Sequence, residues 1–138
     1  WGTPNSSGSV DAAMARHSRD RLKMVVSMSI LAKPAITHFQ RISVGMLEKF
    51  PVSLVACHLE TGRTHQIRVH MSSLGFPLVG DTLYGKQHLV RFFPRQALQA
   101  RKLGLIHPST QLPVEWSIPL ESDFVDLLDR AGMPQPWR

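Results

Sequence analysis

The densest run of polar side chains in this sequence spans residues 60–70, Glu-Thr-Gly-Arg-Thr-His-Gln-Ile-Arg-Val-His. Gly62 permits a tight backbone turn, and the free N–H groups at the start of the helix that follows favour a nearby anion. Arg63, before that helix, can direct a planar charged fork at such an anion, whereas Arg68, inside it, projects toward a sheet or a cleft. The run therefore predicts a site for a phosphate or a carboxylate. A purely structural interpretation stays open, in which Glu60 pairs with one of the arginines and the histidines cap and fill.

Other groupings of reactive side chains point to less chemistry. His65 and His70 are five residues apart, on different sides of a helix, and no His-Glu-x-x-His pattern accompanies them, so we predict no metal site. Asp81 lies in Gly-Asp-Thr-Leu-Tyr-Gly, where an aspartate usually organises a turn, and we interpret it so rather than as a nucleophile or base. Ser72, His70 and Asp81 lack the nucleophile elbow of a serine hydrolase.

The elements that must position the polar run are strands before it and a helix at its end. Three segments show a period of two and are expected to be strands: residues 21–26, 35–44 and 52–60. After Thr61 the apolar residues recur at three and four positions, which predicts a helix over residues 65–74 with Thr64 as its N-cap.

The second half of the chain is expected to hold a hairpin and a terminal helix. Residues 98–106 and 112–118 are strand-like and flank a turn at His107-Pro-Ser-Thr. Residues 119–138 are interpreted as an amphipathic helix, with Ser122 as N-cap, and a tail.

The remaining segments carry no clear period. We expect a loop at residues 1–9, irregular structure at 10–20, and an ordered loop at 78–96 with a turn of helix near residues 89–93. The whole reads as one α+β domain over residues 1–138, with a mixed, mainly antiparallel sheet and a few helices.

The charge of the chain is uneven. Sixteen Lys and Arg against ten Asp and Glu give a formal net charge of +6. Residues 1–102 hold 14 of those basic residues and five of the acidic ones, a charge of +9, and residues 103–138 carry −3. A basic body attracts polyanions, of which nucleic acid is the commonest, although many basic surfaces are merely solubilising.

Cysteine usage and hydropathy limit the compartment. Cys57 is the only cysteine, which excludes an internal disulfide, leaves a thiolate zinc site without ligands and fits a reducing compartment, the cytoplasm. The longest apolar stretch, Met24–Ala32, is interrupted by serines and too short for a membrane span, so we expect no membrane partner.

Taken together, Leu59–Met71, Pro77–Asp81 and Tyr84-Gly85 resemble the RluA-type family of pseudouridine synthases, and within it the RluD-like enzymes of large-subunit ribosomal RNA. Further segments resemble the family in the same order, so the similarity runs from about residue 16 to residue 118. The resemblance implies a partial pseudouridine synthase domain and a cofactor-free isomerase for RNA modification. Such an enzyme detaches uracil from its ribose, turns the base and rejoins it through C5. RNA, in particular ribosomal RNA, is the implied partner, and the complete enzyme is implied to be a monomer.

In this family the nucleophile is an Asp in a His-Arg-Leu-Asp motif, and a Tyr from a later motif packs against the target base. Neither motif occurs in residues 1–138, and Arg19–Leu22 holds similar letters in another order, so Asp20 does not inherit the role. We therefore expect the C-terminal portion of a catalytic domain, with its nucleophile upstream of Trp1 and no activity by itself. The alternative is a non-catalytic module that binds RNA.

The resemblance assigns roles residue by residue. Arg68 matches the family's basic partner of the catalytic aspartate, where a fixed guanidinium keeps that carboxylate ionised and oriented. Contacts to RNA, or packing within the motif, are implied for the four residues that match its other positions: Arg63, Thr64, His65 and Gln66. Gln99 replaces a His that relatives commonly carry, and we expect this change to alter packing or RNA contact rather than the reaction.

Overall fold

The computed structural model describes residues 1–137. Its elements in chain order are β1 (Ser7–Asp11), β2 (Met14–Arg16), β3 (Met24–Val26), β4 (Ile36–Leu47), β5 (Phe50–Leu59), α1 (Gln66–Ser73), the 3-10 helix η1 (Gln87–Phe92), β6 (Lys102–Ile106), β7 (Pro113–Ser117) and α2 (Ser122–Arg130). All the strand pairs are antiparallel and the helices are few, which confirms the α+β prediction. Among residues 1–137, none of the helices has the length and apolarity needed to cross a bilayer.

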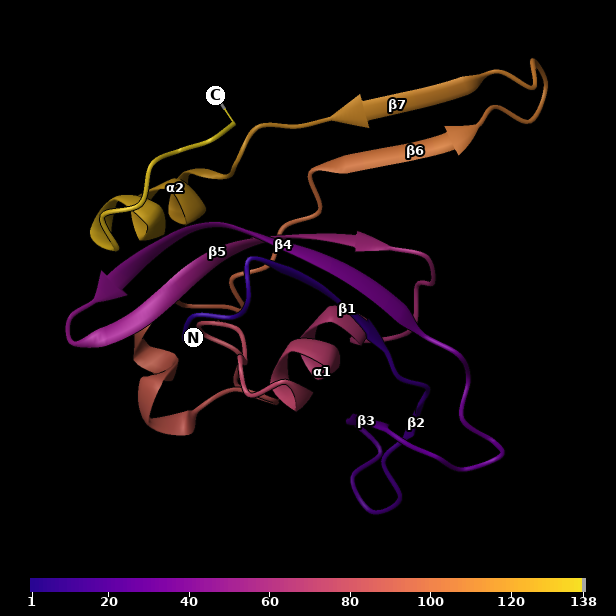
Figure 1. Cartoon of the computed structure of the whole chain (residues 1–138), viewed down its shortest axis with the longest axis horizontal. Coiled ribbons are helices and arrows are strands. Elements are labelled where there is room, and N and C mark those ends of the chain that lie inside the picture. Colours follow the sequence, from indigo (N-terminus) through magenta and orange to yellow (C-terminus); the bar gives the residue numbers. More distant parts are fainter. Residues whose placement is uncertain (138) are drawn as a thin grey trace.

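The main sheet has three strands in the order β1-β4-β5. Strands β4 and β5 form a long hairpin, and the register shifts between Arg41 and Ser43, a bulge that bends the pair. Helix α1 lies beneath this sheet, and the β6–β7 hairpin extends away from the body of the molecule (Figure 1). The sheet therefore gives α1 a fixed surface on one side.

Two predictions for the first 20 residues are wrong. Residues 7–11 form β1, which pairs with β4 over five positions, and residues 14–16 form β2, paired with β3. The pattern missed β1 because Val10 is its only buried side chain, so no apolar alternation marks the strand. The expected strand at 21–26 is also shortened to β3, because the Lys23 N–H donates to the Asp20 carbonyl and closes a turn there.

The N-cap residues of both helices differ from the expected ones. Helix α1 starts at Gln66 with His65 as N-cap, not Thr64, and no side chain caps it. The Gln66 side-chain oxygen instead accepts the N–H of Arg63 at 2.9 Å, which holds the segment before the helix. Ser122 is the first residue of α2 and its N-cap is Glu121. Gln99 binds this start, since its oxygen accepts the Glu121 N–H at 2.9 Å.

Two apolar clusters form the core. The larger joins the β4–β5 hairpin to η1 and α2 through residues such as Val52, Phe92 and Leu128. The smaller holds Met14, Ala35 and Val69, with Met24, Val26 and Tyr84 packed against it, and so lies between the β2–β3 hairpin and α1. The smaller cluster therefore supports the polar run.

Candidate active site

Arg68 and Asp81 form the most buried ion pair of the described residues. Arg68 projects from the middle of α1, and Asp81 lies in the loop that follows the helix. The Arg68 Nε donates to Oδ2 at 2.8 Å and Nη2 donates to Oδ1 at 2.9 Å, so the pairing is bidentate. The Asp81 side chain has no exposed surface, and that of Arg68 is 13% exposed.

Asp81 also organises the turn that carries it. Its Oδ1 accepts the N–H groups of Leu83 at 2.9 Å and Tyr84 at 3.0 Å, which confirms the interpretation of Asp81 as a turn former. Burial by itself raises the pKa of Asp81, but the hydrogen bonds from Arg68 and these N–H groups outweigh burial and hold that pKa below its ordinary value. Asp81 is thus a fixed anion whose two oxygens are both engaged.

The backbone before Asp81 is packed tightly against a second segment. Gly80 has φ +72°, and a Cβ there would lie 2.0 Å from the Arg95 carbonyl oxygen. Arg95 is itself clamped to α2, since its Nε and Nη2 donate to the Asp123 carboxylate at 2.9 and 3.0 Å. The position of Asp81 therefore depends on a contact that only glycine allows.

One edge of the Arg68 guanidinium stays open. Asp81 takes Nε and Nη2, and Nη1 has no hydrogen-bond partner within residues 1–137. The hydrogen bond to Asp81 is the main reason that the pKa of Arg68 is raised. The Arg68 Cζ lies 5.0 Å from the Tyr84 ring centroid, which adds a cation–π contact. Arg68 is therefore a charged donor of fixed orientation.

Tyr84 connects Arg68 to His65 and to β3. Its hydroxyl oxygen accepts the Met24 N–H at 2.8 Å and lies 2.8 Å from His65 Nδ1. His65 has φ 58°, in the left-handed region that few residues other than glycine adopt. Burial and then the charge of Arg68 lower the pKa of His65, and its Nδ1 shares a hydrogen bond with the Tyr84 hydroxyl.

A chain of buried hydrogen bonds anchors α1 from its other side. The Gln66 amide nitrogen donates to Thr37 Oγ1, and this hydroxyl lies 2.9 Å from His70 Nδ1. His70 Nε2 in turn lies 2.9 Å from the Ala12 carbonyl oxygen, which can only accept, so Nε2 is the donor of this bond. Thr37 and His70 have no exposed surface. These hydrogen bonds therefore connect α1 to β4 and to the segment after β1.

The structure separates the four residues assigned to RNA. Thr64 is exposed, and Arg63 and His65 are half-buried at the surface. Gln66 is only 3% exposed, and its amide oxygen and nitrogen are both used by protein partners, so it packs within the motif. The open alternative that Glu60 pairs with an arginine is wrong, because Glu60 pairs with His38.

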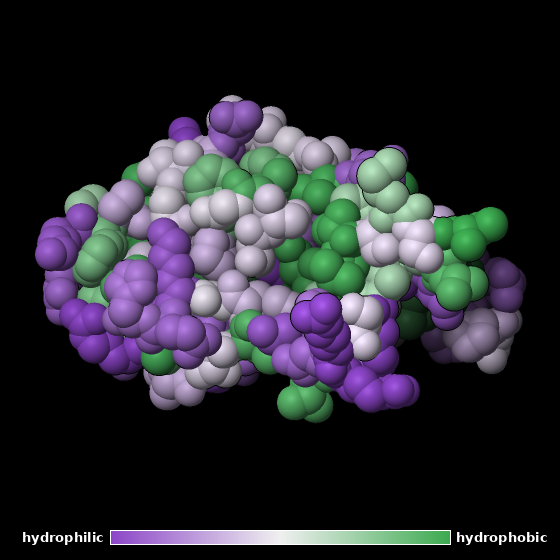
Figure 2. Space-filling model, turned by 90° about the horizontal axis from the view of Figure 1, so that it is seen from below, coloured by the Kyte–Doolittle hydropathy of each residue, from purple (hydrophilic) through white to green (hydrophobic). Residues whose placement is uncertain are grey.

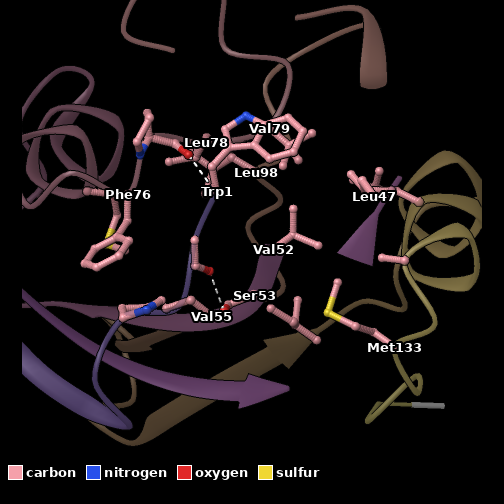
Figure 3. Close-up of a pocket in the computed structure, with 18 of the residues that line it drawn as sticks. Trp1, Leu47, Val52, Ser53, Val55, Phe76, Leu78, Val79, Leu98 and Met133 are labelled. Atoms are coloured by element: carbon pink, nitrogen blue, oxygen red, sulfur yellow. Dashed lines mark hydrogen bonds between the residues drawn. The ribbon is translucent and has the colours of Figure 1, made fainter. Parts of the chain in front are cut away.

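A groove of about 910 Å³ adjoins the Arg68 cluster. It lies between the β2–β3 hairpin and residues 62–64, and sequence reasoning did not foresee it because its cationic residues come from three separate segments. A second cavity, of about 100 Å³, is apolar and lies near Trp1, Val52 and Val79 (Figure 3). Cys57 borders that cavity, and burial raises its pKa to about 11, so the thiol is protonated there at neutral pH.

Candidate metal ligands do not gather in the described part of the chain. No group of three or more His, Cys, Asp or Glu side chains within residues 1–137 is placed to hold a metal ion.

The structure described so far defines an α+β domain that holds a buried Arg–Asp pair beside a basic groove. Residues 2–73 match the family described as RNA pseudouridylate synthase, and the chain belongs to that family. Ribosomal large subunit pseudouridine synthase D of Pseudomonas aeruginosa is 45% identical to this chain, and the aligned region covers 92% of this chain and 42% of the Pseudomonas protein. An uncharacterized RNA pseudouridine synthase of Bacillus subtilis is 46% identical to this chain, and the aligned region covers 88% of this chain and 38% of the Bacillus protein.

A solved structure gives the same result. Human RNA Pseudouridylate Synthase Domain Containing 1 superposes with a TM-score of 0.74 at 29% identity, covering 98% of this chain and 63% of that one. The chain spans about two fifths of the length of these curated relatives.

Proposed function

We propose that the protein is an RNA pseudouridine synthase acting on large-subunit ribosomal RNA, and that residues 1–138 supply the part of its catalytic domain that positions the reacting groups. The observation that carries this proposal is Arg68, held by a buried carboxylate and open at Nη1. The reaction is an isomerisation, in which the N1–C1′ bond breaks, a C5–C1′ bond forms, C5 loses a proton and N1 gains one. Its atoms balance without an oxidant, a reductant or a nucleotide.

The nucleophilic aspartate comes, in this proposal, from a segment outside residues 1–138. Asp81 does not fit that role because its side chain is fully buried and both oxygens already accept hydrogen bonds. The open Nη1 edge of Arg68 suits a second carboxylate, which it would keep ionised and aimed at the target ribose. Asp81 thus positions Arg68, and Arg68 positions the nucleophile.

Other residues of the site are assigned to RNA. The His65 ring is held by its hydrogen bond with Tyr84, and exposed Thr64 adds a hydroxyl, so both suit contacts to ribose, base or phosphate. The protein is proposed to be a monomer and to work in the cytoplasm, where its ribosomal RNA substrate is found. The runner-up is a module that binds RNA without chemistry, favoured by the absence of a His-Arg-Leu-Asp motif from residues 1–138.

The test uses the full coding sequence that contains residues 1–138, with Arg68→Lys and Arg68→Ala. Single-turnover release of tritium from [5-³H]uridine ribosomal RNA is measured at saturating enzyme, alongside the RNA dissociation constant. We expect the rate to fall by about 10²-fold or more, as for loss of other fixed charged donors, with affinity within about 3-fold.

The matched control is Arg91→Lys, which alters an exposed pair with Glu48. It should leave the rate unchanged. Wild-type rates in Arg68→Ala would remove Arg68 from the site, and wild-type protein that binds RNA without releasing tritium would favour the module. Residues 1–138 alone should give no turnover.

A further inference from the structure

We propose that the groove between the β2–β3 hairpin and residues 62–64 binds the single strand of RNA that adjoins the target uridine. Phosphates would lie on its cationic side chains and bases against its apolar wall. The inference rests on the proposed function for the identity of the target, but its evidence is the chemistry of the groove.

The cations of the groove are available. Arg16, Lys33 and Arg63 supply these cations, and of the described lining residues none is Asp or Glu. Two of the arginines are held by carbonyl oxygens, which orient a guanidinium without neutralising it: Arg16 donates to the Arg21 carbonyl at 2.5 Å, and Arg63 Nε donates to the Pro34 carbonyl at 2.9 Å. Lys33 is exposed, and its Nζ has no partner within residues 1–137.

Two acidic side chains close to the groove cations along the chain are already engaged. Glu60, three residues before Arg63, pairs with His38. Asp20 accepts the Leu22 N–H at 3.0 Å and lies 3.9 Å from the Lys23 ammonium, and it is not part of the lining. A cationic groove that no carboxylate of its own lining neutralises attracts a polyanion, which would release counterions on binding.

The rest of the lining selects for single-stranded RNA over a duplex or a free phosphate. Hydroxyls of Ser18, Ser27, Ser29 and Thr64 alternate with the apolar side chains of Met24, Val25 and Leu31. Hydrophilic and hydrophobic side chains likewise lie side by side on the face seen in Figure 2. A duplex hides its bases, whereas an unstacked single strand presents phosphates, 2′-hydroxyls and base faces together, which is what this mixed wall can contact.

The groove leads to the candidate active site. Its Met24 donates a backbone N–H to the Tyr84 hydroxyl, which contacts His65, and its Thr64 precedes His65 in the chain. A nucleotide extruded toward Arg68 would therefore have its neighbours in this groove. Holding them offsets the cost of unstacking, about a few kcal/mol.

The experiment compares two double variants of equal charge in the full-length protein. Arg16→Gln/Lys33→Gln removes two groove cations, and Lys49→Gln/Lys86→Gln removes two exposed lysines that do not line the groove. Binding of a labelled 16-nucleotide single-stranded RNA with one uridine is followed by fluorescence anisotropy from 50 to 300 mM KCl. Lys33→Gln alone serves as a second variant, because Lys33 has no side-chain hydrogen-bond partner among the described residues.

The expected result is a change in salt dependence as well as affinity. The slope of log K against log salt should become shallower by about 1.4 in the groove double variant and by about 0.7 in Lys33→Gln, with binding weakened about 10-fold or more near 100 mM salt. The surface double variant should keep the wild-type slope, apart from a small general loss.

Two outcomes overturn the inference: equal slopes in the two double variants, or an acidic peptide that competes for the groove as well as RNA does. The result also separates the inference from the proposed function. If the groove variants keep the wild-type slope and tritium release is normal, the groove inference is refuted and the proposed function is not. A shallower slope in the groove double variant, together with no tritium release by the wild-type protein, supports the groove and refutes the enzyme.

Discussion

Replacing Asp81 by Asn tests the geometry on which the site depends. The change keeps the shape of the side chain but removes its charge, and it turns one of the two oxygens into a donor. Arg68 Nε, Arg68 Nη2 and the Leu83 and Tyr84 N–H groups all donate to the carboxylate, so in either amide orientation an NH₂ group faces another donor. The Arg68 charge, 13% exposed, is left without its partner.

The expected loss in the free energy of unfolding is large for the exchange of one oxygen for an NH₂ group. Removing one member of a buried pair costs about 3–5 kcal/mol, and partial exposure of Arg68 places this case near 3. For a chain of this size such a loss lowers the melting temperature by about 12 °C. Thermal and urea unfolding of Asp81→Asn and wild type at pH 7 measure it. Glu48→Gln, which removes a carboxylate from the exposed pair with Arg91, is the matched control and should shift the midpoint much less.

The pH dependence gives the reasoning a second check. The pKa of Asp81 is lowered in the folded protein, so its contribution is fully present above the unfolded value of about 3.9 and is lost as the pH falls through the lower folded value. The stability gap between wild type and Asp81→Asn should therefore narrow below about pH 4. A melting difference within 2 °C at pH 7, or a gap that is as large at pH 2.5 as at pH 7, would refute the account.

Two further substitutions test the supports on either side of Arg68. His70→Leu, which leaves two buried polar groups without their partners, should cost about 3 kcal/mol in urea unfolding, whereas His58→Leu at an exposed position should cost little. Gly80→Ala places a Cβ against the Arg95 carbonyl and should cost about 2 kcal/mol more than Gly75→Ala, which shares a positive φ but has open space around it; equal losses would contradict the close contact.

Much of the fold follows from periodicity, and the exceptions have physical causes. The β4–β5 strands, α1 and α2 were indicated by apolar spacing, because each buries one face. The β6–β7 hairpin was indicated by its two strand-like runs around a turn, although its strands are almost fully exposed. Strand β1 was missed because backbone pairing to β4, rather than side-chain burial, holds it in place. The cap of α1 was misplaced because His65 takes a left-handed backbone conformation at the N-cap, where no side chain caps the helix.

The site was predictable in its members but not in its pairing. The polar run pointed to Arg68, and the glycines around residue 81 pointed to a turn. Nothing in local spacing says that a turn aspartate 13 residues away meets that arginine. That contact depends on the Gly80 approach to Arg95, which is a property of the folded chain. The family resemblance named the arginine's role and left this second carboxylate unmentioned.

Helix α1 explains why so many bonds converge here. With eight residues it is too short to be stable alone, so tertiary contacts must set its position. Gln66 and His70 bind it to β4 and the segment after β1, while Arg68, on the other side, binds Asp81. Because both sides are fixed, the free Nη1 edge of Arg68 has little freedom to turn. A donor of fixed direction stabilises a charge at one place only, which is where we propose that the nucleophilic carboxylate is held.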